Sequence, residues 1–334
     1  MPVMTLNIGL IGATRIAERA VVMPSARYGD ATIRAVAASD SGRAATFAAR
    51  NRIPVVHRDY SALIDDSTIN TVYISLHNSA HHTWVARAAS AGKHVIVEKP
   101  LCLDGDELAA IEEAASATGV RFIEAVPTMG HEWQAAVREM LADSSYGALR
   151  SARTRIQFAM PPSEGYRCRP ELGGGIFFDA SSYWLQAVQA VCGLADATGT
   201  GHSDFCGPNG VDSSFSSQLT WPDGREWVAE CSFGAKHIAE HEFVFDHAIA
   251  RLRQFLLPIA GSASLNLVVH SNDAGRVIVK FAPIAYYAIQ FARIRDVLTS
   301  AASDRVSEDS AAERIRMMAA IFADAHMRRG EATG

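Results

Sequence analysis

The stretch LNIGLIGATRIAERAVVM, residues 6–23, predicts a strand, a glycine turn and a helix in immediate succession. The apolar run Leu6–Ile11 stops at Gly12, and the segment from Ile16 to Met23 has helical character. Apolar runs and helical segments then alternate as far as about residue 125. Alternation at this spacing is typical of right-handed βαβ units, so we expect an α/β fold that begins with a doubly wound parallel sheet.

The predicted elements differ between the two parts of the chain. In the first part we expect further strands at 33–38, 71–76, 95–97 and 122–123 and helices at 43–50, 82–91 and 106–117. From about 126 onward we expect strands at 150–158, 213–220, 226–233, 265–270 and 277–281, a long helix at 181–192 and a terminal helix at 310–329. Strands without helices between them favour a large, mainly antiparallel sheet. We therefore expect two domains, 1–125 and 126–334, with a terminal helix able to pack back on the first.

Composition excludes several classes of protein. The chain has 334 residues, which is comfortable for two domains, and 49% of them are hydrophobic and 20% charged. A formal net charge of −5 gives no basic surface for nucleic acid. No apolar run is long enough to span a membrane, and the N-terminal stretch lacks the positive region of a signal peptide. We expect a globular protein without a membrane or nucleic-acid partner.

Cysteine usage points to a reducing compartment. The five cysteines are scattered along the chain without a C-x-x-C pair, which favours free thiols and a cytoplasmic location over a disulfide framework. His81 and His82 are adjacent, and no cysteine or histidine stands at ligand spacing around them. We therefore expect no metal site.

The glycine turn is a candidate dinucleotide site. Measured against G-x-G-x-x-G, the sequence offers Gly12, Thr14 and Ala17. The first glycine allows the tight turn, and the small Ala17 allows close packing of helix on strand. A helix that starts here directs its N-terminus at a pyrophosphate. Gly12, Thr14, Arg15 and Ile16 are thus candidates for binding NAD or NADP, although Thr14 departs from the motif's middle glycine.

The end of the second strand bears on the choice between the two nucleotides. An acidic side chain there suits the ribose hydroxyls of NAD, and a neutral residue with a nearby arginine suits the 2′-phosphate of NADP. Asp40 fits the first pattern, while Ser39 with Arg43 fits the second. The sequence leaves both open.

Lys99 is the first candidate for chemistry. The sequence Glu98-Lys99-Pro100 follows an apolar strand, and ligands collect at the carboxyl ends of such strands. A lysine there can hydrogen-bond the reacting oxygen of a substrate. The alternative is a surface lysine beside a turn proline.

Three segments in the same order carry a family resemblance. AGKHVIVEKPL (91–101) resembles the AGKHV-x-x-EKP signature of the glucose–fructose oxidoreductase/inositol dehydrogenase/MocA family. VYISLHNSAHHTW (72–84) is similar to the family's VYIPLPNSLHAEW segment, and YRCRPELGGGIFFDASSY (166–183) to its R-x-x-PELGGG-x-x-x-D-x-x-x-[HY] block. The resemblance implies a Rossmann domain that binds NAD(P), followed by an α+β domain for substrate binding and oligomerisation.

Residue by residue, the resemblance implies the following roles. It makes Lys99 the catalytic lysine, Asp179 a substrate-contacting or supporting carboxylate, and Tyr183 the proton donor or acceptor. The same comparison implies further contacts to the nicotinamide from Leu76, His77, Asn78, His81 and Glu98, and to substrate from Lys99, His131, Arg167, Asp179 and Tyr183. The alternatives are that Asp179 caps the helix at 181–192 and that Tyr183 only packs.

Several positions depart from the family pattern. Ser75 and His77 replace two prolines, and Ser181 replaces a glycine. Met129 lies in a segment, 127–131, where members often carry Tyr-Arg-His. These departures bear on the substrate class more than on the fold.

The resemblance implies hydride transfer between C4 of the nicotinamide and a hydroxyl or keto carbon of a sugar, a nucleotide-sugar or a polyol. Alternatives are a trans-dihydrodiol or aldose 1-dehydrogenase of the same family, and a sensor that binds NAD(P) without turnover. An exposed face on a large sheet is expected to be apolar. The family resemblance implies that such faces pack together in homodimers or homotetramers.

Overall fold

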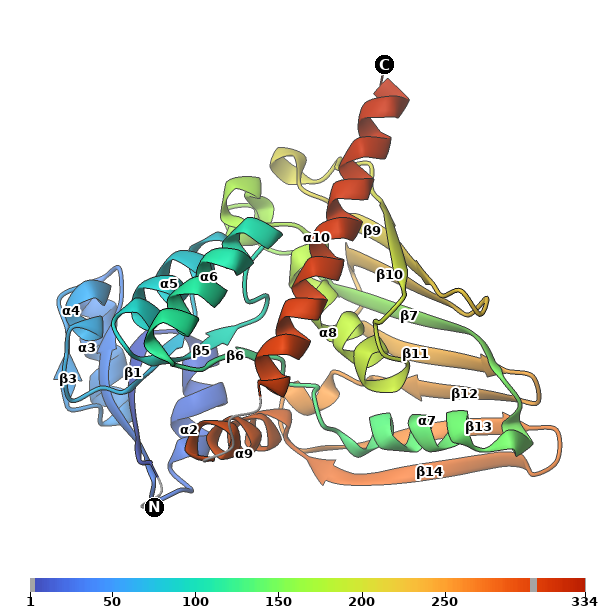
Figure 1. The fold of residues 1–334 in the computed structure, drawn as a ribbon, viewed down its shortest axis with the longest axis horizontal. Coiled ribbons are helices and arrows are strands. Elements are labelled where there is room, and N and C mark those ends of the chain that lie inside the picture. Colours follow the sequence, from blue (N-terminus) through green and yellow to red (C-terminus); the bar gives the residue numbers. More distant parts are fainter. Residues whose placement is uncertain (1–3, 301–304, 334) are drawn as a thin grey trace. The chain divides into compact units, whose positions relative to one another are not determined.

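The computed structural model describes residues 4–300 and 305–333 (Figure 1). The chain forms two compact units, Met1–Pro127 with Tyr287–Ile315, and Thr128–Tyr286 with Arg316–Gly334. The segment 287–315 thus returns to the first unit, and the division falls inside the last helix. No helix among the described residues is long and apolar enough to cross a membrane.

A six-stranded parallel sheet forms the centre of the first unit. Its strands are β1 (Leu6–Ile11), β2 (Ala31–Ala37), β3 (Val55–Val56), β4 (Thr71–Ile74), β5 (His94–Glu98) and β6 (Phe122–Ala125). They lie in the order β3-β2-β1-β4-β5-β6, and each neighbouring pair is parallel. This order is that of a dinucleotide-binding sheet, in which the strand order reverses between β1 and β4. The expected doubly wound parallel sheet is confirmed.

Helices connect these strands. They are α1 (Arg15–Ala17), a π-helical turn η1 (Glu18–Val22), α2 (Met23–Ser25), α3 (Ser41–Asn51), α4 (Tyr60–Ile64), the 3₁₀ turn η2 (Asn78–Ala80), α5 (His81–Ser90) and α6 (Gly105–Thr118). Aspartates begin three of them, because the side chains of Asp40, Asp59 and Asp104 accept hydrogen bonds from the first turns of α3, α4 and α6. The four residues of β4 are all buried, as expected for a strand covered on both faces.

The returning segment is tied to this sheet by ion pairs. It holds α9 (Tyr286–Thr299) and the start of α10 (Val306–Thr333). Arg295 binds Asp30, with Nη2 2.6 Å from Oδ2. Arg314 donates from Nη2 to Oε2 of Glu124 at 2.7 Å, and both side chains are buried. These pairs join the end of the chain to β6 and to the turn before β2.

The second unit is built on an eight-stranded sheet. Its strands are β7 (Leu149–Ala159), β8 (Thr198–His202), β9 (Ser214–Thr220), β10 (Glu226–Gly234), β11 (Ile238–Phe245), β12 (Ala248–Arg253), β13 (Ala263–Ser271) and β14 (Gly275–Ile284). Their order is β14-β13-β12-β11-β7-β10-β9-β8, and every neighbouring pair is antiparallel except β7 with β10. The expected large, mainly antiparallel sheet is confirmed. The unit also contains α7 (Glu132–Ala142), α8 (Ile176–Val191) and the 3₁₀ turns η3 (Ser144–Tyr146), η4 (Tyr166–Cys168), η5 (Pro170–Leu172), η6 (Pro208–Gly210) and η7 (Leu257–Ile259).

Aromatic side chains fill the inner face of this sheet. Trp227 and Phe243 are fully buried with rings in edge contact, and His241 stacks on Phe255 at 4.0 Å between ring centroids. Burial lowers the pKa of His241 to about 3, so this imidazole is neutral and acts as a core aromatic. The helix α8 lies over β9 and β10 on this side, where Phe177 contacts Phe215 of β9.

Helix α8 begins five residues earlier than expected. The sequence predicts a helix from Ser181, but the helix starts at Ile176, and its N-cap residue Gly175 makes no side-chain cap. Asp179 therefore lies inside the first turn, which corrects the alternative in which it caps the helix. The cap comes from a distant loop, described below.

Candidate active site

The glycine turn after β1 fits a dinucleotide. Gly12 has φ of 106°, a conformation that favours glycine, and a Cβ there would stand 2.4 Å from the carbonyl oxygen of Ser75. The turn thus brings the ends of β1 and β4 together, where the strand order reverses. The chain then enters the continuous helical run 15–25, with Arg15 exposed and Ile16 half-buried in its first turn. The residues present suit a pyrophosphate at a helix N-terminus.

Two departures from the family pattern are partners in the structure. The Thr14 hydroxyl accepts the backbone N–H of Ala17 at 3.1 Å and so caps the helix. The same oxygen lies 2.8 Å from the hydroxyl of Ser75, where a proline was expected. Thr14 therefore caps the helix and joins the turn to the residue that follows β4.

The residues that bear on the choice between NAD and NADP lie together just after β2. Asp40 accepts the backbone N–H of Arg43 at 2.5 Å as the N-cap of α3. Nη2 of Arg43 donates to the Ser39 hydroxyl at 3.0 Å, and all three side chains are exposed. One carboxylate oxygen of Asp40 is thus engaged by its own helix, while Ser39 and Arg43 form a pair.

The loop after β4 is fixed by a buried histidine. Nδ1 of His81 lies 2.7 Å from the carbonyl oxygen of Pro100, and its Nε2 lies 3.3 Å from that of Leu76. Burial lowers the pKa of His81 to about 4 despite these carbonyls, so the ring is neutral. The fully buried His81 therefore joins the loops after β4 and β5. In the same loop His77 bonds Ser79 at 3.1 Å and Asn78 is buried.

Glu98 is the last residue of strand β5, and Lys99 follows it directly. The Tyr73 hydroxyl, on the neighbouring strand β4, donates to Oε1 of Glu98 at 2.6 Å. Burial raises the pKa of Glu98 to about 7, although this bond and the charge of Lys99 oppose the shift. Lys99 is half-buried, and its peptide bond to Pro100 is cis. The sequence analysis did not identify Tyr73. Only its position in the strand that ends just before Ser75 could have indicated a role near the site.

We expect Glu98→Gln to gain stability relative to the wild type as the pH rises. The folded protein keeps the Glu98 proton up to about pH 7, whereas a glutamate of pKa 4.5 in the unfolded chain releases it earlier. Wild-type stability therefore falls between these pH values, and a neutral amide does not share this loss. The relative gain should reach about 3 kcal/mol by pH 7 and stay constant above it. Urea unfolding of both proteins across this range measures it, and a constant difference would contradict the shift.

In the second unit, three candidates form one cluster. Nε of Arg167 donates to Oδ2 of Asp179 at 2.7 Å. Tyr183 lies one helical turn beyond Asp179 on α8, and its ring makes an edge contact with Phe158. Burial works against the charge of Arg167, but the carboxylate of Asp179 and the neighbouring Tyr183 raise its pKa. The cluster is an ion pair beside a phenol, at the start of a helix.

A loop residue that sequence reasoning missed holds this helix start. The carboxylate of Asp212 accepts the backbone N–H of Phe177 at 2.7 Å, and its carbonyl oxygen accepts that of Ile176 at 3.0 Å. A Cβ on Gly175 would stand 1.9 Å from this carboxylate, so the position requires glycine. Burial raises the pKa of Asp212 to about 7. The glycine run and Asp212 together fix the start of α8.

His131 has a different place. Its Nδ1 accepts the backbone N–H of Trp133 at 3.1 Å as the N-cap of α7. The ring is buried and lies edge-on to Phe281 and Tyr286, each with a centroid separation of 5.5 Å. We therefore assign His131 to the core of the second unit rather than to substrate.

The candidates thus gather in two groups. The first unit brings Gly12, Leu76, His77, Asn78, Glu98 and Lys99 to the carboxyl ends of β1, β4 and β5, and the pair Ser39–Arg43 follows β2. The second unit brings Arg167, Asp179 and Tyr183 together. Ser181 is fully buried within α8. No cluster of metal-ligating side chains occurs in the parts of the chain that the structure describes.

Two family models match the chain. One, described as an oxidoreductase family with an NAD-binding Rossmann fold, covers residues 6–126, and the other, the GFO/IDH/MocA C-terminal domain, covers 134–250. The chain belongs to the GFO/IDH/MocA oxidoreductase family. It is an NAD(P)-dependent oxidoreductase, and the resemblance inferred from sequence is confirmed.

Relatives and solved structures agree with this placement. The chain is 28% identical over 326 residues to a D-xylose 1-dehydrogenase (NADP(+)) of Haloferax volcanii, covering 96% of this chain and 97% of the relative. It is 32% identical over 254 residues to a dTDP-3,4-didehydro-2,6-dideoxy-alpha-D-glucose 3-reductase of Streptomyces antibioticus, covering 76% of each. A 3-ketoreductase from Actinomadura kijaniata, solved with NADP and TDP-benzene, shares the fold with a TM-score of 0.87 at 21% identity, covering 96% of this chain and 98% of that one.

Proposed function

We propose that this oxidoreductase transfers hydride between C4 of NADP(H) and a hydroxyl or keto carbon of a sugar, a nucleotide-sugar or a sugar-like polyol. The observation that carries the proposal is the cluster of Arg167, Asp179 and Tyr183 at the start of α8. Family membership and the lysine at the end of β5 support it. The curated relatives named above act on an aldose and on a nucleotide-linked deoxysugar.

Each side chain has a distinct task in this chemistry. The bound nicotinamide supplies or accepts the hydride. The Tyr183 hydroxyl exchanges the proton with the substrate oxygen, and the ammonium group of Lys99 stabilises negative charge on that oxygen. Asp179, held by Arg167, orients the substrate or the proton-transferring group. The hydrogen bond from Arg167 fixes the orientation of the Asp179 carboxylate.

A second candidate is oxidation of a free aldose at C1. It is favoured by the D-xylose relative, which matches almost the whole length of the chain. The same residues serve both reactions, because each requires a base or acid at one oxygen and hydride transfer at the attached carbon.

A turnover assay tests the proposal. Free aldoses, nucleotide-sugars, polyols and a trans-dihydrodiol are offered with NADP and with NAD, and the corresponding ketones with the reduced forms, while absorbance of the reduced nicotinamide is followed. Turnover of at least one sugar-like compound is expected. Tight nucleotide binding with no turnover of any compound would favour a sensor and contradict the proposal.

We expect Arg43→Ala to weaken NADPH binding much more than NADH binding. Ser39 and Arg43 form a pair suited to a 2′-phosphate, and Asp40 is engaged in capping α3. Charge-assisted hydrogen bonds to a phosphate contribute about 1.5–3 kcal/mol, so the loss should be about 10- to 100-fold. Fluorescence titration with both nucleotides measures it.

A matched control lies on the same helix. Arg50 is at the far end of α3, where it pairs with Glu18, so Arg50→Ala should leave both affinities unchanged. Equal losses of NADPH and NADH binding in Arg43→Ala would assign Arg43 to the helix surface and withdraw the preference for NADP.

The protein is also proposed to form a homo-oligomer, at least a two-fold dimer. The open sheet face is charged rather than apolar, which corrects the expectation from sequence. On β7, β10 and β11, Arg155 pairs with Glu240 at 2.9 Å and Arg153 with Glu230 at 3.6 Å. Such alternating charges can exchange partners across a two-fold axis. We expect light scattering to give at least twice the chain mass of 36.0 kDa, and a single species of 36.0 kDa would contradict this.

A cytoplasmic location completes the proposal. All five cysteines are free thiols, and three of them are buried. Such a set suits a reducing compartment and a small-molecule substrate.

A further inference from the structure

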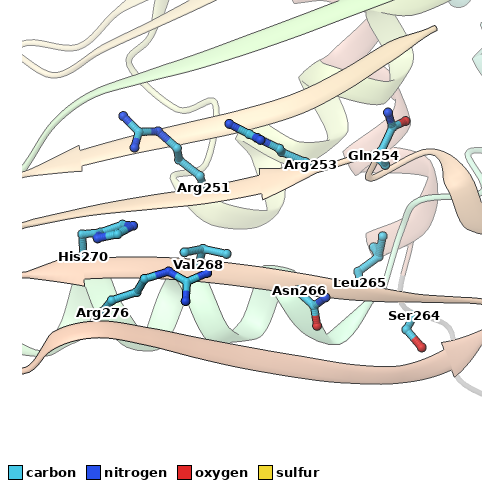
Figure 2. Close-up of a pocket in the computed structure, with 9 residues that line it drawn as sticks. All are labelled: Arg251, Arg253, Gln254, Ser264, Leu265, Asn266, Val268, His270 and Arg276. Carbon is cyan, nitrogen blue, oxygen red and sulfur yellow. The ribbon is translucent and has the colours of Figure 1, made fainter.

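The buried carboxyl group of Glu98 has no task in the proton transfer proposed above. It lies at the carboxyl end of β5, in the unit that matches the NAD-binding model. The exposed arginines of the second unit differ from it in this respect. Arg251, Arg253 and Arg276 line a groove across β12, β13 and β14 (Figure 2), on the sheet face that is proposed to pair with another copy of the chain.

The order of the strands indicates which half of the cofactor lies near Glu98. The turn at Gly12 after β1 suits the pyrophosphate, and Ser39 with Arg43 after β2 suits the ribose of the adenosine half. Since β2 and β4 lie on opposite sides of β1, the nicotinamide half extends from the turn toward β4 and β5. Adjacent strands are about 4.8 Å apart, so the ends of β1 and β5 are separated by about 10 Å. The nicotinamide half of an extended dinucleotide can span this distance.

Both neighbouring strands contribute a side chain that acts on Glu98. Tyr73 on β4 is fully buried and donates its hydroxyl to Oε1 of Glu98 at 2.6 Å. The backbone N–H of Lys99 also bonds the carboxylate, and the charge of Lys99 attracts it. Glu124 on β6 repels it, and Tyr287 on α9 acts on Tyr73. The carboxyl group is thus held in one orientation at the end of its strand.

Glu98 changes its charge near neutral pH. Burial raises its pKa to about 7, and the like charge of Glu124 acts in the same direction. The hydrogen bond from Tyr73 and the charge of Lys99 oppose this rise. Tyr73 therefore has two effects: it fixes the place of the negative charge, and it makes the loss of the proton easier.

The two forms of the cofactor differ in the charge of the nicotinamide ring. The oxidised ring carries a positive charge, and the reduced ring carries none. We propose that Glu98, positioned by Tyr73, makes the protein discriminate between the two forms: the carboxylate favours the oxidised ring, and the neutral carboxyl group favours the reduced one. The carboxylate offsets the charge of Lys99, which otherwise disfavours a cationic ring at the same strand end. Tyr73 is then a positioning residue that acts through Glu98.

Fluorescence titration with NADP⁺ and with NADPH, from about pH 6 to about pH 9, tests the proposal. The ratio of the two dissociation constants is compared, because the 2′-phosphate, which titrates at about pH 6, is common to both forms. As the pH rises, the preference of the wild type for NADP⁺ should increase about tenfold, with its midpoint at about pH 7. Glu98→Gln should keep a constant ratio. The test requires cofactor binding and no substrate, so a failure of the proposed turnover leaves it intact.

Two tyrosine variants separate the roles of the hydroxyl groups. Tyr73→Phe loses a hydrogen bond that stabilises the carboxylate, so the midpoint should rise by about one pH unit. Tyr286→Phe is the matched control and should keep the wild-type midpoint, because its buried hydroxyl donates, also at 2.6 Å, to the carbonyl oxygen of Phe255 in the second unit. A wild-type ratio that is constant with pH, or that changes equally in Glu98→Gln, would overturn the proposal. An unchanged midpoint in Tyr73→Phe would remove Tyr73 from it.

Discussion

Lys99→Ala is expected to lower kcat by about 10²–10⁴-fold, the range of one acid–base contribution. The lysine directly follows β5 and its last residue, the buried Glu98, in the unit that matches the NAD-binding model. Its ammonium group is proposed to stabilise the substrate oxygen, which carries most negative charge in the transition state, so kcat should fall more than substrate affinity. Cofactor affinity, measured by fluorescence titration, should change much less.

Tyr183→Phe is the matching variant. It keeps the ring, which packs edge-on to Phe158, and removes only the hydroxyl. We expect a loss in kcat of similar size, and a Lys99→Ala/Tyr183→Phe double variant little worse than the poorer single one, because groups that act on one oxygen do not contribute additively. Wild-type kcat in Tyr183→Phe across the pH range would withdraw the tyrosine's catalytic role.

The sequence predicted the alternating first unit because its strands are short apolar runs bounded by clear turns. Strand β11 was missed for a specific reason. It alternates inward and outward residues over Ile238–Phe245, but one of its four buried residues is His241, which breaks the apolar pattern. Only the packing shows that this imidazole is neutral and stacked on Phe255. Strand β3, with two exposed residues, offers almost no periodic signal.

The start of α8 illustrates a second limit. Local signals for a helix start are side-chain caps, and the run of glycines before Ile176 offers none. The cap comes from Asp212, which lies 35 residues beyond Phe177 in the chain. The motif therefore identified Asp179 as a candidate, whereas its position inside the helix required the fold.

In the candidate site, too, motifs identified individual residues but not the contacts between them. The departures at Thr14 and Ser75 could each be noted from the sequence, but their hydrogen bond joins residues 61 positions apart. Tyr73 and Glu98 are likewise 25 positions apart, on adjacent strands. Motifs predict which residues matter when the family shares them. Residues that act through a neighbour, such as Tyr73 and Asp212, become visible only when the strands and loops are placed.

Glu124→Leu is expected to destabilise the protein by about 3–5 kcal/mol, the cost of leaving a buried charge without its partner. Glu124 accepts from Nη2 of Arg314 at 2.7 Å, and both side chains are buried. Arg293 lies close to this pair, and burial together with the charge of Arg314 lowers its pKa to about 10. Removing Glu124 thus leaves the buried Arg314 and the half-buried Arg293 without this carboxylate. Denaturant unfolding of the full chain measures the effect as a lower midpoint.

The double variant Glu124→Leu/Arg314→Leu separates the lost attraction from the penalty of a buried charge left without its partner. Because it removes one buried arginine with the carboxylate, it should be less destabilised than Glu124→Leu alone. Glu18→Ala is the surface control: Glu18 pairs with Arg50 at 2.6 Å, but 57% of the Arg50 side chain is exposed, so the cost should stay below about 1 kcal/mol. If Glu124→Leu costs no more than Glu18→Ala, the pair does not hold the returning helices to β6, and the anchoring must come from their apolar faces.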